Sequence, residues 1–170
     1  MRIIWMTVLC FCVMLSTIGC SSTEWQQYTK LAEAFKQAQY DVPDYTQITG
    51  HVDQLLGRYE RIKPFLTRET YNQLYRNRTL AIALGTAKKQ QCNIEVTSFQ
   101  LEEQSETEAE PKTVKSMSFT YSMTMQLRDA QGQLIEVIEV PAGQMDFAIQ
   151  DGGLFILSDR DGEPLMSKYN

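Results

Sequence analysis

Along residues 117–128, apolar and polar side chains alternate without a break, and this run constrains the fold more than any other stretch. Its apolar members are Met117, Phe119, Tyr121, Met123, Met125 and Leu127. Successive side chains of a β-strand point to opposite faces of a sheet, so a period of two predicts one buried face and one solvated face. Antiparallel sheets expose one face to water in this way. We therefore expect an antiparallel sheet with one buried face.

Three further strands are expected around this run. The alternation shifts its parity near Thr97-Ser98, which predicts a bulge in the first strand. Gly132 closes a hairpin turn of the kind that needs a positive φ angle. Pro141 in the return strand predicts an edge position or a bulge, because proline cannot donate to a ladder. A turn at 151–153 leads into the last strand. The further strands are predicted over 92–101, 133–149 and 154–157.

Ahead of the strands, apolar residues recur every three or four positions, which predicts amphipathic helices. The first helix is expected to begin at Thr23, which matches a capping box with the glutamine three residues later, and to end before Pro43. The second is expected over about 45–61, and Thr67 is a suitable N-cap for the third. Residues 78–91 combine an alternating pattern with alanines, so a helix and a strand both stay open there.

Helices followed by a run of antiparallel strands predict an α+β fold, with N-terminal helices packed on a bent antiparallel sheet of about four strands. The chain has 170 residues, 43% of them hydrophobic, which suffices for one core. We expect a single domain over 24–160. Residues 158–170 are polar and are expected to lie outside the sheet, with 161–170 as a C-terminal tail.

This order of elements resembles the cone-shaped nuclear transport factor 2-like (cystatin-like) fold. The Leu66-Thr67 stretch leading into Tyr71, Leu74 and Asn77-Arg78, with the turns around Gly132 and Gly152-Gly153, resembles small secreted members of that family in Gram-positive bacteria. The resemblance implies a Gram-positive host and a cone between the helices and the sheet.

The first twenty residues form a separate unit. Met1 and Arg2 precede an apolar run over 3–18, which is typical of an export signal. As a helix this run would span roughly 24 Å, less than the roughly 30 Å hydrocarbon core of a bilayer. The run ends in Gly19-Cys20-Ser21-Ser22. This end resembles the lipobox of bacterial lipoproteins, in which a small residue precedes the cysteine whose thiol receives a diacylglycerol group before the signal is removed.

The lipobox resemblance implies a signal peptide over 1–19, a lipidated N-terminus over 20–23 and lipid attachment at Cys20. The protein is then expected on the extracytoplasmic face of the cell membrane, or at the outer membrane in a Gram-negative host, given Ser21. Palmitate is among the lipids expected there. An uncleaved amphiphilic anchor and ordinary secretion stay open as alternatives.

The other cysteines do not fit this role. Cys10 and Cys12 lie inside the apolar run and do not follow a small residue. The mature chain then keeps Cys20 and Cys92, and lipid on the first excludes an intrachain disulfide. We expect Cys92 to be a small buried hydrophobe and not a reactive thiol.

Composition argues against several classes of function. A net charge of -5 does not suit a nucleic-acid binder, which needs clustered cations.

His51, the one histidine, cannot build a histidine triad or a multi-histidine metal site and is expected in solvent. The acidic stretch 102–112 and the turn predicted at 159–162 are not expected to hold a metal. Asp146 and Glu139 are the remaining acids that an enzyme could use, and Asp146 is expected to face solvent. We expect no enzyme activity and no cofactor.

Charge is unevenly distributed along the chain. Residues 58–89 carry eight Lys or Arg and two Glu, whereas residues 91–170 carry five cations and fourteen anions. The basic helices could face anionic lipid, an envelope protein or an anionic surface polymer, or could pair with the acidic strands. The candidate partner surface consists of Arg58, Arg61, Lys63 and Arg68.

These features together predict a non-catalytic cell-envelope lipoprotein that acts as a binding or assembly module at the outer face of the membrane. The alternative function is a carrier of a small apolar ligand in the cone between helices and sheet. The residues that would line such a cone are Phe119, Tyr121, Met123 and Met125, which otherwise form plain core.

Overall fold

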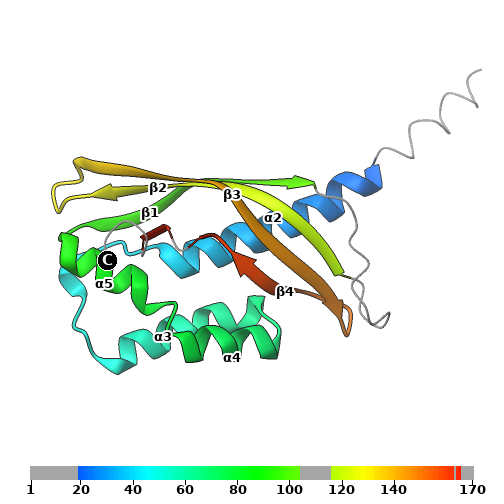
Figure 1. The fold of residues 1–170 in the computed structure, drawn as a ribbon, viewed down its shortest axis with the longest axis horizontal. Helices are drawn as coiled ribbons and strands as arrows, with labels where there is room; N and C mark the ends of the chain where they lie inside the picture. The colour runs from blue at the N-terminus through cyan, green and yellow to red at the C-terminus, as the bar shows by residue number, and fades with distance from the viewer. Residues whose placement is uncertain (1–18, 104–115, 163, 166–170) are drawn as a thin grey trace, which may run out of the picture.

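The structure is a computed structural model and describes residues 19–103, 116–162 and 164–165. These residues form a four-stranded antiparallel sheet in the order β1-β2-β3-β4, and the helices lie along one side of it (Figure 1). The predicted α+β fold with four antiparallel strands is confirmed. The helical elements are α2 (Gly19–Tyr40), η1 (Tyr45–Gln47), α3 (Val52–Ile62), η2 (Lys63–Phe65), α4 (Arg68–Asn77) and α5 (Ala81–Gln90), and the strands are β1 (Asn93–Glu103), β2 (Ser116–Arg128), β3 (Leu134–Gln150) and β4 (Gly153–Arg160).

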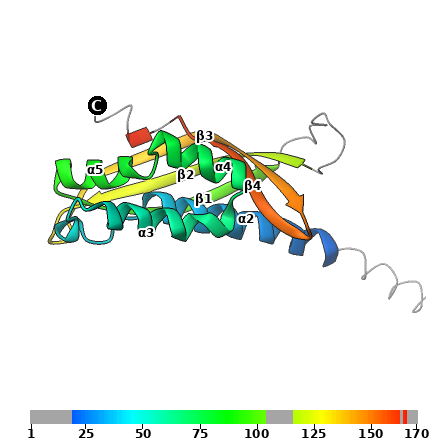
Figure 2. The same cartoon turned by 90° about the horizontal axis from the view of Figure 1, so that it is seen from below.

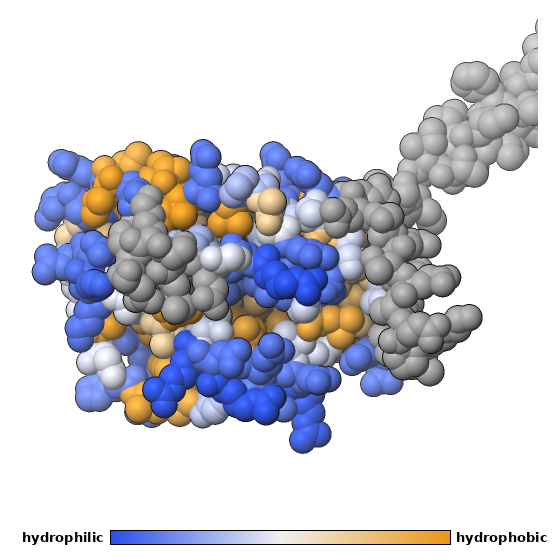
Figure 3. Space-filling view, viewed as in Figure 1, coloured by the Kyte–Doolittle hydropathy of each residue, from blue (hydrophilic) through white to orange (hydrophobic). Residues whose placement is uncertain are grey.

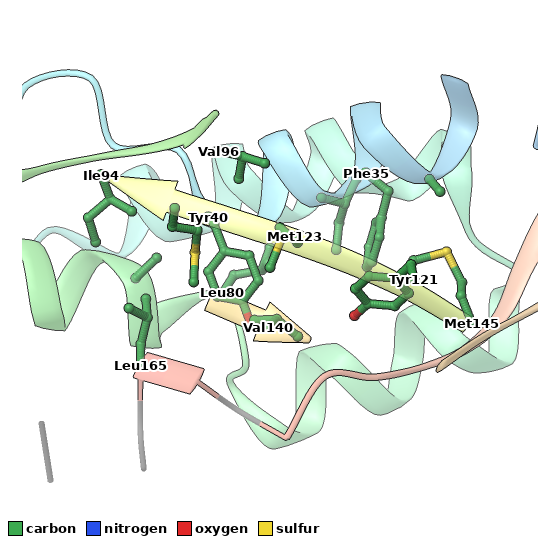
Figure 4. Close-up of a cluster of buried hydrophobic side chains, with 14 of the residues drawn as sticks. Phe35, Tyr40, Leu80, Ile94, Val96, Tyr121, Met123, Val140, Met145 and Leu165 are labelled. Carbon is green, nitrogen blue, oxygen red and sulfur yellow. The ribbon is translucent and has the colours of Figure 1, made fainter. Parts of the chain in front are cut away.

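The core lies between α2 and the inner face of the sheet. The apolar residues of β2 from Phe119 to Leu127 are at most 2% exposed, as their alternation predicts. Phe35 of α2 points toward Tyr121 and Met123 of β2 (Figure 4). Near the start of α2, the ring centroid of Tyr28 lies 5.1 Å from those of both Phe119 and Phe147. Aromatic pairs at such distances add to the free energy of apolar burial.

The irregularities of the sheet fall where the sequence predicts them. The register of β1 shifts between Val96 and Ser98, which confirms the first bulge. The register between β2 and β3 shifts beside Pro141, and β4 pairs only with Gln144–Gln150, so this proline lies both at a bulge and beyond the reach of β4. Gly132 has a φ of 81° in the hairpin turn.

Gly143 is required by a close approach. A Cβ at this position would lie 2.2 Å from the Cζ of Tyr121, which faces it across the β2–β3 pair. No side chain fits there unless the Tyr121 ring moves.

Segments from the helical half cover parts of both outer strands. Val42 forms an antiparallel bridge with Ile94 of β1, and Leu66 forms a parallel bridge with Ile156 of β4. The N–H of Thr67 donates to the carbonyl of Ile156. Free strand edges invite pairing with other chains, so these bridges protect part of the sheet.

Two predicted helix starts are wrong. Helix α2 begins at Gly19, so Thr23 lies inside it and is not its N-cap. Helix α3 begins only at Val52 and not at about residue 45, because Gly50 adopts a φ of 75° that interrupts a helix. The stretch around 45 instead forms η1, where the Asp44 side chain accepts from the N–H of Thr46.

The ends of α4 are set by local features of the sequence, and the stretch after it is a helix. Thr67 caps α4 by accepting a hydrogen bond from the N–H of Thr70, as predicted. Arg78 then adopts a left-handed conformation with a φ of 55° and ends α4. The open choice at 78–91 is settled as helix α5.

The predicted polar tail is wrong for its described part. Strand β4 continues to Arg160, beyond the predicted end at Leu157. Asp161 accepts a hydrogen bond from Lys36, and Leu165 is 1% exposed. Residues of this segment therefore contact the interior of the domain, Asp161 through a buried ion pair and Leu165 by packing. The polar composition of the segment does not indicate these contacts. None of the described helices has the length and hydropathy needed to cross a membrane.

Candidate functional site

Helix α2 carries a buried cation. Lys36 has no solvent exposure, and its Nζ donates to Asp159 Oδ2 at 2.6 Å and to Asp161 Oδ2 at 2.7 Å. Gln39 Oε1 accepts a third bond at 3.2 Å. The hydroxyls of two tyrosines complete the group, that of Tyr121 donating to Asp159 at 2.9 Å and that of Tyr40 donating to Asp161. We call these six residues the Lys36 cluster.

The buried positive charge of Lys36 is balanced by the carboxylates of Asp159 and Asp161. The Nζ also lies 5.0 Å from the ring centroid of Tyr121, within cation–π range. Burial raises the pKa of the Asp159 carboxyl and the charge of Asp161 acts in the same direction, while Lys36 opposes both. Burial also raises the pKa of the Tyr121 hydroxyl, so it remains a donor. Through these hydrogen bonds the cluster joins α2 to β4 and to Asp161 just beyond it.

Residues 159–162 were predicted to form a turn, and this is wrong, because Asp159 and Arg160 belong to β4. The sequence held one signal of the cluster: Lys36 lies four residues after Ala32 and eight after Tyr28, on the buried side of α2. Its acidic partners lie more than 120 positions away, so periodicity could not identify them.

Arg58 of α3 is a second buried cation. It was predicted on a partner surface, and this is wrong, because it is 3% exposed. Its Nη1 donates to the carbonyl of Asp41 at 2.9 Å and its Nη2 to the carbonyl of Gln39 at 2.8 Å. A cation is favourable at this place, where the carbonyls at the end of α2 lack helical partners. Burial and the charge of nearby Arg61 lower the pKa of Arg58 to about 10, so the guanidinium stays protonated at pH 7.

A small cavity lies beside Arg58, where the loop after α2, η1, α3 and α5 meet. Its volume is ≈ 170 Å³. We call it the loop pocket. Its apolar wall includes Val42, Pro43, Ile48 and Leu84, and its polar wall includes Gln54, Arg58 and Arg61. Within the part of the chain that the structure describes, two buried side-chain polar atoms have no hydrogen-bond partner, Gln54 Oε1 and Arg58 Nε. Both residues line this cavity.

A larger groove of ≈ 350 Å³ lies along the start of β1, on the other side of Pro43. Its partly buried polar side chains are already hydrogen-bonded within the protein. Asp41 Oδ1 accepts from the N–H of Val96, and Asn93 Oδ1 accepts from the N–H of Tyr45. The groove therefore lacks the unpartnered groups that distinguish the loop pocket.

Helices α3 and α4 lie on the near side of the molecule in Figure 2. Their exposed side chains are of mixed character. The Tyr59 ring centroid lies 4.9 Å from that of Tyr75 and 6.3 Å from that of Tyr71, which ties the two helices together. Lys63 Nζ lies 5.7 Å from the Tyr71 ring centroid. We call the exposed set the α3–α4 face; it consists of Val52, Leu56, Lys63, Arg68 and Tyr75.

A second exposed apolar area lies at the start of β3. Leu134, Ile135 and Val137 are 52%, 53% and 41% exposed. Figure 3 shows hydrophobic surface over the end of the molecule where β3 begins. Among the described strands, this half of β3 pairs with β2 alone, since β4 pairs with later residues.

The remaining predicted positions lie as follows. The backbone of Cys20 is in the first turn of α2, and its side chain is outside what the structure describes, so lipid attachment stays a prediction. Arg61, Lys63 and Arg68 are exposed, as a partner surface requires. Cys92 is fully buried, and burial raises the pKa of its thiol, in agreement with a small hydrophobe.

The predicted lining of a ligand cone is wrong. Phe119, Tyr121, Met123 and Met125 are 0–2% exposed and belong to one packed cluster of buried apolar side chains. These side chains are core.

The acidic candidates differ from one another. Glu139 is exposed. Asp146 is on the outer face but is not simply solvated, because it accepts bonds from Ser118 Oγ at 2.6 Å and Ser158 Oγ at 2.5 Å. His51 is exposed just before α3. Most of the acidic stretch 102–112 lies outside the described residues. No group of three or more His, Cys, Asp or Glu in the described ranges is arranged to hold a metal ion.

Comparison with known proteins supports the fold. No protein-family model matches the chain, and no curated protein matches it. Among solved structures, it is similar to one described as a periplasmic fragment of TraM, with 16% identity and a TM-score of 0.50. The match covers 78% of this chain and 97% of that chain. At this identity the likeness shows a shared fold and carries no site residues across.

Proposed function

We propose that the chain is a non-catalytic binding or assembly module of the bacterial cell envelope, held at the outer side of a membrane through lipid on Cys20. Two observations support this location. The apolar run of the sequence ends in a small residue followed by Cys20. The structural neighbour named above is a periplasmic fragment of its protein.

The α3–α4 face carries the proposal of a binding role. Val52 is 69% exposed, Leu56 39% and Tyr75 47%, and large apolar side chains exposed together suggest an interaction surface. Cations flank them at Arg68 and at Lys63, whose Nζ also pairs with Glu60 Oε2 at 3.3 Å on the surface. Arginine and tyrosine are enriched in protein interfaces, where tyrosine supplies a large apolar area with a polar tip.

The chemistry of this face selects the partner. Its apolar side chains need apolar groups opposite them, and its cations favour carboxylates at the rim. An acidic protein surface with exposed apolar side chains offers both. An anionic polymer would engage the cations and leave the apolar side chains uncovered. We therefore propose an acidic envelope protein as the partner.

The carrier alternative loses its support, because the side chains assigned to the ligand space are packed core. An enzymatic role has no arrangement that favours it among the described residues. Asp146 is held by two serines, and Glu139 is an exposed carboxylate.

The anchor is tested by the intact mass of protein extracted from membranes of its host, beside that of a Cys20→Ala variant. Loss of residues 1–19 together with added acyl mass on the wild-type chain, and an unprocessed variant, would support the proposed anchor. A full-length chain without added mass would contradict it.

The binding role is tested by placing a photo-crosslinking residue at Tyr75 in intact cells. We expect one defined protein adduct, weakened by Lys63→Glu or Arg68→Glu. Lys30→Glu is the control, since Lys30 is an exposed cation on α2, away from this face. Absence of an adduct, equal effects of all three reversals, or an adduct to polymer alone would each contradict the proposed protein partner.

A further inference from the structure

The loop pocket has bonding capacity that the described protein does not use. Buried side-chain polar atoms are almost always hydrogen-bonded, so an unpartnered one needs a reason. Here an unpartnered donor, Arg58 Nε–H, and an unpartnered acceptor, Gln54 Oε1, belong to residues that line the same cavity. Arg58 is itself 97% buried. A ligand that both accepts and donates would satisfy the two atoms together.

The position of Arg58 is fixed before any ligand arrives. Two of its nitrogens are held by the carbonyls of Gln39 and Asp41 at the end of α2. A side chain held in this way loses little conformational freedom when its remaining N–H forms a bond. The Arg58 guanidinium is therefore held in place before a ligand binds to its Nε–H.

The charge of the cavity favours an anion. Arg58 and Arg61 lie close enough that the charge of Arg61 contributes to the lowered pKa of Arg58. Neither makes a salt bridge with a described acid. Asp44 also lines the cavity, but its carboxylate accepts from the N–H and hydroxyl of Thr46 and from Gln47 Nε2. The charge of Asp41 also acts on Arg58, but its carboxylate accepts from the N–H of Val96 and lines the neighbouring groove. The cavity wall thus carries two arginines against one carboxylate, and this positive balance favours an oxyanion.

The remaining walls narrow the choice of ligand. Val42, Ile48 and Leu84 are apolar, and a bare inorganic oxyanion would leave them unused. The volume of ≈ 170 Å³ corresponds to about five or six water molecules, which is room for one small residue. The ligand should thus combine an anionic end, an adjacent N–H donor and a small apolar group.

We propose that the loop pocket binds the C-terminal carboxylate of a peptide that ends in a small apolar residue. The carboxylate accepts from Arg58 Nε–H and from Arg61. The amide N–H of the last residue donates to Gln54 Oε1, and its side chain packs against the apolar wall. This site is separate from the α3–α4 face and from the partner proposed for it.

The proposal is tested by NMR on the full chain in a maltoside detergent, with ¹⁵N in the arginine side chains. Arginine Nε–H signals report directly on the unpartnered donor. The probe is N-acetyl-alanine, and the expected result is a saturable shift of the Arg58 Nε–H signal. N-acetyl-alanine amide lacks the carboxylate and acetate lacks the N–H, so both should bind at least about tenfold more weakly.

Two variants assign the contacts. Gln54→Glu has the same shape and replaces the acceptor amide with a carboxylate that repels the ligand, so the affinity for N-acetyl-alanine should fall at least about tenfold. Arg61→Gln should also weaken binding. Arg68→Gln removes the same charge from the α3–α4 face outside the pocket and should leave the affinity within about twofold. Backbone spectra confirm that each variant is folded.

Three outcomes would overturn the proposal. Inorganic phosphate that binds as well as N-acetyl-alanine would make the site one for oxyanions in general. Water contacts to the Arg58 Nε–H with no effect of any probe would show a cavity filled by solvent. Equal weakening by Gln54→Glu and Arg68→Gln would show nonspecific attraction. None of these outcomes changes the crosslinking expected at Tyr75, so the two proposals fail separately.

Discussion

The Lys36 cluster and the loop pocket each contain a cation with almost no solvent exposure, and their surroundings differ. Lys36 bonds two carboxylates and an amide oxygen, and two tyrosine hydroxyls complete the shell of the carboxylates. Arg58 bonds two backbone carbonyls, faces no carboxylate in hydrogen-bond range among the described residues, and keeps one N–H unpartnered. The first arrangement is complete within the protein, whereas the second has room for one more group.

This difference should change how much stability the protein loses when each cation is removed. A buried ion pair resists the loss of either partner, because the survivor is then an uncompensated charge in a medium of low polarity. A buried cation bonded only to carbonyls leaves no ion behind when it is removed. The consequences for stability should therefore be larger at Lys36 than at Arg58.

The largest effect is expected for Lys36→Met. The substitution leaves Asp159 and Asp161 facing each other without a cation and should lower the free energy of unfolding by about 3–5 kcal/mol. Urea denaturation at pH 7 measures this loss. Lys30→Met on the exposed side of α2 is the matched control and should stay within about 0.5 kcal/mol of wild type. A loss below that of Arg58→Met would contradict the comparison.

Arg58→Met should have a smaller effect. It leaves the carbonyls of Gln39 and Asp41 without their donor, at about 1–2 kcal/mol for each, so the free energy of unfolding should fall by about 2–4 kcal/mol. The same urea titration measures it. The double variant with Lys36→Met shows whether the two cations act independently, because additive losses are expected for sites without shared partners, and Gln39 is shared here.

Gly143→Ala tests the Lys36 cluster from the side of β2. The new methyl group collides with the Tyr121 ring and displaces the hydroxyl that donates to Asp159, so stability should fall by about 1–3 kcal/mol. Thermal unfolding of both glycine variants provides the measurement. Gly85→Ala in α5 meets no atom within 4 Å and should stabilise the protein by up to about 1 kcal/mol. If Gly143→Ala were equally neutral, the close approach would not constrain the sheet.

The effect of Asp159→Asn should be smaller than that of Lys36→Met, because Asp161 still pairs with Lys36, and it should depend on pH. Because the pKa of Asp159 is raised in the folded state, ionisation favours unfolding, and the stability gained from the protonated form is lost as pH rises through the folded-state pKa. The asparagine variant cannot ionise. Its stability relative to wild type should therefore improve from pH 4 to pH 7 in urea titrations. A relative stability that declines over this range would mean that Lys36 dominates the titration of Asp159.

Local patterns in the sequence predicted the sheet well. The alternation along β2 specified its buried face, and Thr67 was identifiable as a cap because N-cap chemistry depends on neighbouring residues alone. The start of α3 was misjudged because the apolar spacing continues through Ile48, whereas Gly50 breaks the helix by its conformation.

The buried cations could not be predicted in the same way. Both Lys36 and Arg58 are long charged residues in amphipathic helices, and such residues are mostly exposed. Their burial depends on partners outside their own helices: Asp159 and Asp161 for the first, and the end of α2 for the second. The loop pocket likewise joins segments from α2 to α5, so no single stretch of sequence indicates it.

The continuity of α2 from Gly19 fixes the distance between the proposed lipid attachment and the loop pocket. Twenty-two helical residues extend about 33 Å at 1.5 Å for each residue. The proposed lipid attachment is at the first turn of this helix, and the loop pocket begins directly after its last turn. Because α2 packs against the sheet from Tyr28 onward, it is part of the domain and not a free tether. Lipid on Cys20 would therefore hold the domain itself close to the membrane, with the loop pocket at the far end of the same helix.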